Sequence, residues 1–368
     1  MSIGVYIHIP FCGKKCPYCD FYSAPASNRS MDRYTATMTE RLEAYRNKGV
    51  TADTLYFGGG TPNLLGGERL SRLIQTARDV FAMPANSEIT VEANPATATP
   101  AFFRQIFTSG TNRLSLGLQS ANSDELAFLG RRHTQSQAAA AVKAAREAGF
   151  SNISLDLMIG LPGQTTEQLG QSIAFCANLG VEHVSSYLLK IEEGTPFFAR
   201  RNTLSLPDED AVSELYFFAV EELARQGFAQ YEISNFAKPG YEGRHNLKYW
   251  HCEEYLGFGP AAHSFFDGQR FYSSRSLEDF FDDQPPISDG KGGSREEFLM
   301  LSLRLTEGVS DAQWQLRFGE PLPSSLLQAA HRYESPGLIA FDNPDRFHLT
   351  PKGFLVSNPL LRELLDTL

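Results

Sequence analysis

Three cysteines lie within eight residues near the start of the chain, in the segment FCGKKCPYCDF. Cys12, Cys16 and Cys19 have the spacing C-x3-C-x2-C, so one short loop can wrap its thiolates around a metal centre. Iron–sulfur clusters are held by such thiolates, and three of them leave one iron of a four-iron cluster open to another ligand. The segment therefore predicts a [4Fe-4S] site with one accessible iron.

A closed zinc site and three merely structural thiols are the alternatives. Structural zinc takes four ligands, and His8 is the nearest candidate for the fourth, since Cys176 and Cys252 are distant in the sequence. A disulfide framework is disfavoured because the chain has five cysteines, an odd number, and we expect it to stay in the cytoplasm.

Other residues with useful chemistry stand at the ends of predicted strands. The run 58–62 (GGGTP) follows the strand predicted at 54–57, and its bare backbone allows a ligand to approach closely. Glu92 and Gln119 end the next two predicted strands, and Asp156 lies in the one after them. A single glycine turn or carboxylate of this kind also occurs in ordinary turns and helix caps, so the repetition at successive strands is what indicates a binding site.

These residues need a scaffold that brings strand ends together. Residues 1–230 alternate β-rich runs with helical patterns: strands at 5–9, 54–57, 89–92, 113–118, 153–158 and 183–189, and helices at 31–48, 68–81, 100–108, 136–148, 166–179 and 208–226. Such alternation predicts right-handed βαβ units and an α/β fold with a parallel sheet, closed as a barrel or partly open. In that sheet the carboxyl ends of the strands share one face.

The remainder of the chain has a different character. Residues 231–271 are irregular and aromatic, and 282–293 (DDQPPISDGKGG) have the composition of a linker, so 231–290 is predicted to be an extension of the core. Residues 291–368 contain helical patterns at 296–305 and 311–318 and a hairpin at 338–349 that turns at Asn343, Pro344 and Asp345. This order predicts a small α+β domain like a winged helix.

Composition excludes several classes of protein. The 368 residues are 42% hydrophobic and 21% charged with a net charge of −10, which predicts a packed globular protein without a nucleic-acid footprint. From Ser294 onward there are 7 Lys and Arg against 10 Asp and Glu, so the C-terminal domain is a poor phosphate binder. With no signal peptide and no membrane span, we expect a cytoplasmic protein and leave peripheral membrane contact and a homodimer open.

The cysteine triplet and the later motifs together resemble radical S-adenosylmethionine (SAM) proteins over essentially the whole chain. The resemblance implies a partial (β/α)6-type barrel in which SAM chelates the open iron through its amino and carboxylate groups. One reducing electron then cleaves the sulfonium to a 5′-deoxyadenosyl radical, while the protein orients and shields the cofactors.

The pattern is similar to the subgroup of oxygen-independent coproporphyrinogen III oxidases and HemW-type haem chaperones. The resemblance implies that the aromatic Tyr6 lies beside SAM, that Arg131 meets the SAM carboxylate, and that Asp156 binds the ribose. Arginine suits that role because its planar guanidinium pairs with a carboxylate through two hydrogen bonds. The other SAM contacts implied in this way are Phe21, Gly59, Gly60, Thr61, Glu92 and Gln119.

Two features separate the branches of this subgroup. The oxidase pattern has a further cysteine two residues after the third, where this chain has Asp20 and then Phe21, and only eleven residues precede Cys12 in place of a long N-terminal segment. Both departures argue against decarboxylase activity, which remains the alternative function. A tRNA-modifying radical SAM enzyme is disfavoured because no second cysteine trio and no basic tail are present.

The segment RHNLKYW resembles the HNxxYW signature of the haem-binding HemW branch. The resemblance implies a haem site formed by His245, Asn246, Tyr249 and Trp250, with a neutral imidazole as iron ligand. His251, Cys252 and His263 are alternatives for a second axial ligand. We therefore expect a protein that binds a [4Fe-4S] cluster, SAM and haem and delivers haem to apo-haemoproteins such as respiratory enzymes, with no catalytic residue assigned.

Overall fold

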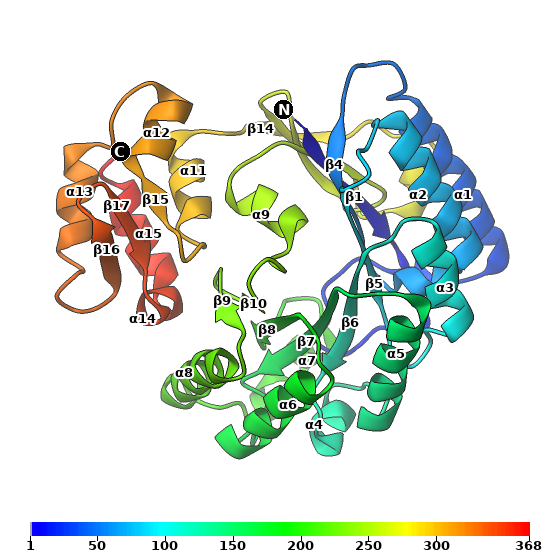
Figure 1. Ribbon diagram of the computed structural model, residues 1–368, viewed down its shortest axis with the longest axis horizontal. Helices are drawn as coiled ribbons and strands as arrows, with labels where there is room; N and C mark the ends of the chain where they lie inside the picture. The colour runs from blue at the N-terminus through cyan, green and yellow to red at the C-terminus, as the bar shows by residue number, and fades with distance from the viewer. Residues whose placement is uncertain (1) are drawn as a thin grey trace.

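Six parallel strands form the centre of the fold, in the order in which they occur along the chain (Figure 1). They are β1 (Ile3–Ile9), β4 (Ala52–Gly59), β5 (Glu88–Ala93), β6 (Arg113–Gln119), β7 (Ile153–Ile159) and β8 (His183–Leu188). Most of their side chains are buried, and Val5, Ile7 and Ile9 are fully enclosed. The computed structural model describes residues 2–368 and confirms the predicted α/β fold.

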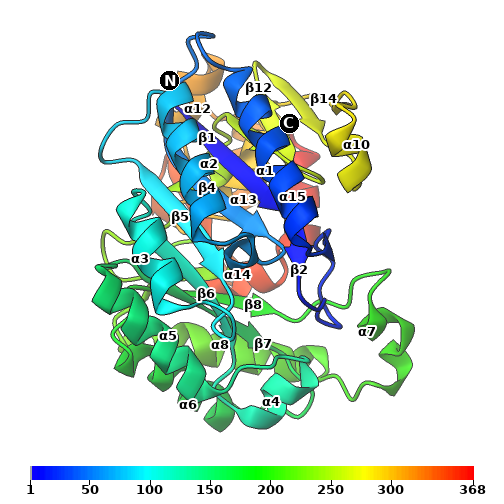
Figure 2. The same cartoon turned by 90° about the vertical axis from the view of Figure 1, so that its right-hand side faces the viewer.

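Helices connect successive strands and cover the outer face of the sheet (Figure 2). The longer ones are α1 (Asn28–Glu43), α2 (Gly67–Val80), α3 (Pro100–Thr108), α5 (Gln135–Ala148), α6 (Thr166–Asn178) and α8 (Glu209–Arg225). Their boundaries follow local chemistry. In α5 a capping box of Thr134 and Gln137 provides hydrogen-bond acceptors for the free backbone N–H groups at the start of the helix. Gly149 ends the helix at φ 112°.

The shorter elements lie mainly near the carboxyl ends of the parallel strands. They are β2 (Phe11–Cys12), β3 (Ala24–Pro25), the 3-10 turns Pro62–Leu65 and Arg201–Thr203, α4 (Ser123–Phe128) and α7 (Pro196–Ala199). β2 pairs in parallel with β3, so the cysteine segment is held by a small sheet of its own.

The sheet continues beyond the six parallel strands at both edges and has twelve strands in all. At one edge β10 (Asn235–Ala237) pairs antiparallel with β8 and is followed by β9 (Ala229–Gln230). At the other, β11 (Tyr255–Phe258) is parallel to β1, and β12 (His263–Phe266), β13 (Gln269–Tyr272) and β14 (Ile287–Lys291) follow antiparallel. The barrel is therefore open, with its edges formed by β9 and β14.

Two local expectations for this region were wrong. The predicted linker 282–293 contains β14, which pairs with β13 through its backbone. All five residues of β14 are exposed, so it has none of the hydrophobic alternation that marks a strand. The segment RHNLKYW lies on a helix, α9 (Arg244–Trp250), and a short α10 (Leu277–Phe281) precedes β14. The division of the first 290 residues at 230 stays a prediction, since one sheet runs through both parts.

The C-terminal region forms a separate lobe with its own core (Figure 1). A three-stranded sheet of β15 (Val309–Ser310), β17 (Arg346–Leu349) and β16 (Ile339–Asn343) packs with α11 (Arg295–Ser302), α12 (Asp311–Phe318), α13 (Ser324–His331), α14 (Pro351–Leu355) and α15 (Ser357–Leu365). The predicted helices and the hairpin that turns at Pro344 and Asp345 are confirmed. Tyr216 and Phe265 from the larger part join this core and so fix the lobe in place.

Among residues 2–368, no helix is both long and apolar enough to cross a bilayer.

Candidate functional site

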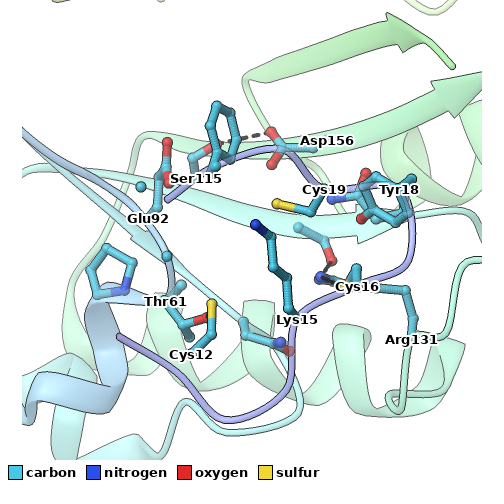
Figure 3. A pocket seen from close by; sticks show the side chains of 18 of the residues that line it. Cys12, Lys15, Cys16, Tyr18, Cys19, Thr61, Glu92, Ser115, Arg131 and Asp156 are labelled. Atoms are coloured by element: carbon cyan, nitrogen blue, oxygen red, sulfur yellow. Dashed lines mark hydrogen bonds between the residues drawn. The ribbon is translucent and has the colours of Figure 1, made fainter. Parts of the chain in front are cut away.

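The three clustered cysteines lie on the loop that follows β1 and line a cavity of about 330 Å³ (Figure 3). The glycine run after β4 holds the beginning of this loop. The Gly60 N–H donates to the Ile9 carbonyl at 2.8 Å, and the Thr61 N–H donates to the Phe11 carbonyl at 2.8 Å. The end of β4 thus continues alongside the cysteine loop and fixes where Cys12 begins.

Glycine is required at these positions by space as well as by backbone angle. A Cβ atom at Gly60 would lie 2.7 Å from the Phe11 carbonyl oxygen, a backbone atom that cannot move aside. Gly59 has φ +106°, and a Cβ there would lie within 2.5 Å of the His8 ring. The glycine run is therefore first a device that packs the end of β4 against the cysteine loop, and it leaves backbone exposed to the cavity as a consequence.

The surroundings of the cysteine sulfurs fit an iron–sulfur cluster. Arg131 Nη1 lies 3.8 Å from Cys16 Sγ, and Thr61 Oγ1 lies 3.5 Å from Cys12 Sγ, so both can donate to sulfur. Lys15 extends into the same cavity (Figure 3). Hydrogen bonds and positive charge at the sulfurs are among the means by which proteins tune such clusters.

The geometry does not fit a single metal ion. Within residues 2–368, no three His, Cys, Asp or Glu side chains converge as they would around one ion. A four-iron cluster needs no such convergence, because each thiolate binds a different iron.

Two carboxylates face the cavity from neighbouring parts of the sheet. Glu92 accepts a hydrogen bond from the Tyr56 hydroxyl at 2.8 Å, and Asp156 accepts one from the Ser115 hydroxyl at 3.0 Å. Burial raises the pKa of Glu92 to about 7 and that of Asp156 to about 6, although both hydrogen bonds act in the opposite direction. Two carboxylates that are costly to ionise in one cavity favour a cationic ligand between or beside them.

Arg131 provides the opposite charge. It follows α4 rather than lying on a helix surface, and its Nη2 donates to the Gly117 carbonyl at 2.5 Å. Its Nε is buried without a hydrogen-bond partner within residues 2–368. Gln119 lies nearby at φ +71°, a strained backbone angle for a residue other than glycine. An unsatisfied donor and a strained residue at the end of one strand indicate a functional site.

Most of the predicted SAM contacts lie around this one cavity. Its lining includes Phe21, Gly59, Gly60, Thr61, Glu92, Gln119, Arg131 and Asp156 together with the three cysteines. Tyr6 is the exception: its ring lies 6.2 Å from that of Tyr56 and faces a different cavity. The prediction missed Tyr56, Ser115, Gly117 and Tyr187, which also line the site. Tyr56, Ser115 and Gly117 lie two or four residues before Gly58 or Gln119, so strand periodicity was the available signal.

His245, predicted as a haem ligand, is enclosed. It is 1% exposed; its Nδ1 lies 2.8 Å from Thr54 Oγ1 and its Nε2 lies 2.7 Å from Tyr249 Oη. Burial, Lys248 and Arg113 together lower the pKa of His245 to about 3, so the imidazole is neutral. Iron coordination by His245 would require one of these hydrogen bonds to break.

Of the other predicted haem residues, Tyr249 contacts His245, whereas Asn246 and Trp250 are not brought to a cavity. Neither Asn246 nor Trp250 lines the cavity of the cysteines or the cavity beside His263. The Trp250 Nε1 is buried without a partner within residues 2–368. Among the alternatives for a second ligand, His251 Nε2 lies 2.7 Å from Glu307 Oε1, and Cys252 is buried against Glu297. His263 alone of these is exposed beside a cavity.

Comparison with known proteins gives the same class as the fold and the cysteine cavity. Residues 6–176 match the radical SAM superfamily, and residues 295–356 match the HemN C-terminal domain. The solved structure of coproporphyrinogen III oxidase (HemN) from Escherichia coli superposes with a TM-score of 0.82 at 22% identity, covering 100% of this chain and 89% of that one. The fold and the site thus define a radical SAM protein, a class that implies a [4Fe-4S] cluster and SAM.

Relatives of known sequence narrow the class to a family. Proteins named heme chaperone HemW are 36% identical in Mycobacterium tuberculosis, over 98% of this chain and 94% of the relative, and 35% identical in Bacillus subtilis, over 99% and 100%. That of Escherichia coli is 39% identical over 73% of this chain and 72% of the relative. The chain belongs to the HemW family.

Proposed function

We propose that this chain is a cytoplasmic haem chaperone, which binds haem and hands it to apo-haemoproteins such as respiratory enzymes. The observation that carries the proposal is the similarity to proteins named heme chaperone HemW over nearly the full length of both chains. The cofactors proposed for it are a [4Fe-4S] cluster held by Cys12, Cys16 and Cys19 and one molecule of SAM.

The chain's own groups suit SAM in the cavity of the cysteines. The Arg131 side chain, whose Nε is buried without a partner within residues 2–368, offers a donor to the SAM carboxylate. Glu92 offers an acceptor to the amino group, and Asp156, largely ionised at neutral pH, offers one to the ribose. SAM bound to the cluster supplies radical chemistry when reduced, while these side chains fix its orientation and keep the cavity charge balanced.

Oxidation of coproporphyrinogen III is the second candidate, since the fold matches that of the oxidase. The residue that stands in place of the oxidase's additional cysteine is Phe21, two residues after Cys19. A phenyl ring cannot replace a thiol as a nucleophile or as a metal ligand, which supports the chaperone.

The deciding experiment uses full-length protein reconstituted anaerobically with iron, sulfide and SAM. We expect it to bind haem in about a 1:1 ratio and to transfer it to an apo-haemoprotein such as apomyoglobin, without converting coproporphyrinogen III under reducing conditions. Absence of stoichiometric haem binding would refute the chaperone proposal. Turnover of coproporphyrinogen III would establish the oxidase in its place.

A further inference from the structure

A second cavity lies beside the residues that follow Cys19. Its volume of about 350 Å³ is within the roughly 300–1,000 Å³ range of small-molecule sites. It is lined by the end of the cysteine loop, by β1, by the carboxyl end of α9, and by β11 and β12; its residues are Tyr6, His8, Asp20, Phe21, Tyr22, Tyr249, Tyr255, Ala261, His263 and Arg275. Phe21 lines both this cavity and the one with the cysteines. The two cavities are therefore neighbours that share the Phe21 side chain.

The walls of this cavity are aromatic, and an arginine paired with an aspartate lies at its rim. Tyr6, Tyr22, Tyr249 and Tyr255 line it, each partly exposed, so their rings offer apolar surface to a ligand. The Arg275 side chain is 56% exposed, and its Nη1 and Nη2 donate to Asp20. The N–H groups of the guanidinium that these bonds do not use can donate to a ligand. Flat apolar walls with an arginine at the rim suit an aromatic macrocycle that carries carboxylates.

The histidines near the cavity differ in what their ring nitrogens do. His8 Nδ1 lies 3.0 Å from Tyr6 Oη, and His8 Nε2 lies 3.0 Å from the Tyr22 carbonyl oxygen, so both nitrogens are engaged. His245 is likewise engaged at both nitrogens and does not line the cavity.

His263 has the opposite character. It is exposed at the start of β12, and no hydrogen bond to its ring nitrogens is found within residues 2–368. Its ring stacks on Tyr272, with 5.1 Å between centroids and 23° between planes, which fixes the orientation of the imidazole.

We infer that this second cavity is the haem site and that His263, rather than His245, supplies the iron ligand. The tyrosines cover the porphyrin faces, and Arg275 meets a propionate at the rim. In HNxxYW, Tyr249 then contributes a wall, and His245 positions that wall through its hydrogen bond to the Tyr249 hydroxyl. This inference rests on the proposed haem-binding function and gives that function a location.

The test is a titration of cluster-reconstituted, full-length protein with haemin, followed by the Soret band. We expect His263→Ala to bind haemin roughly tenfold or more weakly, with a shifted Soret band, and added imidazole to restore the wild-type spectrum. His331→Ala is the matched control, because His331 is also exposed and stacked on an aromatic ring, Phe341 at 4.0 Å, but lies on α13 in the C-terminal lobe. It should bind haemin like wild type, and thermal melting should show that both variants are folded.

The outcomes separate this inference from the proposed function. Wild-type protein that fails to bind haemin would overturn both. Wild-type protein that binds it, together with a His263→Ala variant of unchanged affinity and spectrum, would overturn only the assignment to His263. Loss of binding in His263→Ala without rescue by imidazole, although the variant is folded, would also contradict a ligand role.

Discussion

The ring of Tyr56 stacks on the imidazole of His245, with 5.3 Å between centroids and 26° between planes. The hydroxyl of the same tyrosine donates to Glu92 in the cavity of the cysteines. A helix outside the six-stranded core thus reaches a carboxylate of the proposed SAM site through one aromatic side chain. His245 therefore supports the position of Tyr56 independently of any coordination to iron.

Replacing His245 should therefore cost stability before it affects haem. His245→Ala removes hydrogen bonds to Thr54 and Tyr249 and leaves a buried gap, so we expect a loss of about 2–4 kcal/mol in the free energy of unfolding. Urea denaturation measures it, and SAM affinity should fall as well because Tyr56 loses its support. An unchanged stability combined with loss of haem would instead favour His245 as a direct ligand.

Each cysteine of the triplet should be indispensable for the cluster. Cys12→Ser, Cys16→Ser and Cys19→Ser should each abolish the absorbance near ~400 nm after anaerobic reconstitution, because only three thiolates are offered. Cys176→Ala is the control: that side chain is fully buried on α6, and its replacement should leave iron content unchanged. A cluster that survives Cys12→Ser but not Cys176→Ala would show that the site is misplaced.

Replacing Asp156 should lower the affinity for SAM and leave the iron content unchanged. Asp156→Asn keeps the shape of the side chain but removes the charge, which should weaken SAM binding roughly tenfold or more, as expected for loss of about 1.5–3 kcal/mol from a charge-assisted contact. Equilibrium dialysis with labelled SAM measures the affinity, and iron analysis provides the check. Asp79→Asn, at an exposed position on α2, is the matched substitution and should have no effect. Equal SAM affinity in both variants would remove Asp156 from the site.

Glu92 should make the ligand-free protein less stable as the pH rises. Its folded-state pKa of about 7 lies above the ordinary 4.5, because burial and then Asp156 oppose ionisation more than Tyr56, the Gly59 N–H and Arg113 favour it. A raised carboxyl pKa contributes stability that is present below 4.5 and is lost as pH rises through 7.

The neutral variant Glu92→Gln should therefore be more stable than wild type at pH 8, by about 1–2 kcal/mol after allowance for water in the cavity, and equal to it at pH 4.5. Melting curves at a series of pH values measure this difference. The same variant should bind SAM more weakly, since the acceptor for the cation is gone. A stability difference that does not grow with pH would show that the pKa of Glu92 is not raised in the folded protein.

The sequence predicted the parallel core and the cavity well because both depend on local rules. Buried β-rich runs such as 153–158 and capped helices such as α5 can be recognised from the sequence alone. Parallel strands in such a fold bring their carboxyl ends to one edge of the sheet. Glu92 and Asp156 could therefore be grouped without a structure. Tyr56 and Ser115 lie on the same strands at alternate positions to Gly58 and Gln119, so strand alternation predicts that they face the same side.

The rest depends on contacts between distant parts of the chain. The exposed strand β14 exists only because β13 offers it a backbone edge. His245 looks like a free imidazole in RHNLKYW until Thr54, from β4, is placed beside its ring. His263 differs from His245 in that its ring nitrogens have no such partners within residues 2–368. The spacing of residues in the sequence does not distinguish the two histidines.

Phe21 borders the cavity of the cysteines and the cavity of His263, and it is 64% exposed. Any effect that SAM has on haem affinity through this side chain must be mirrored, since thermodynamic linkage requires the two ligands to change each other's binding by the same factor. Measuring haemin affinity with and without SAM therefore fixes the coupling in both directions. In Phe21→Ala, which removes the shared wall, that coupling factor should move towards one.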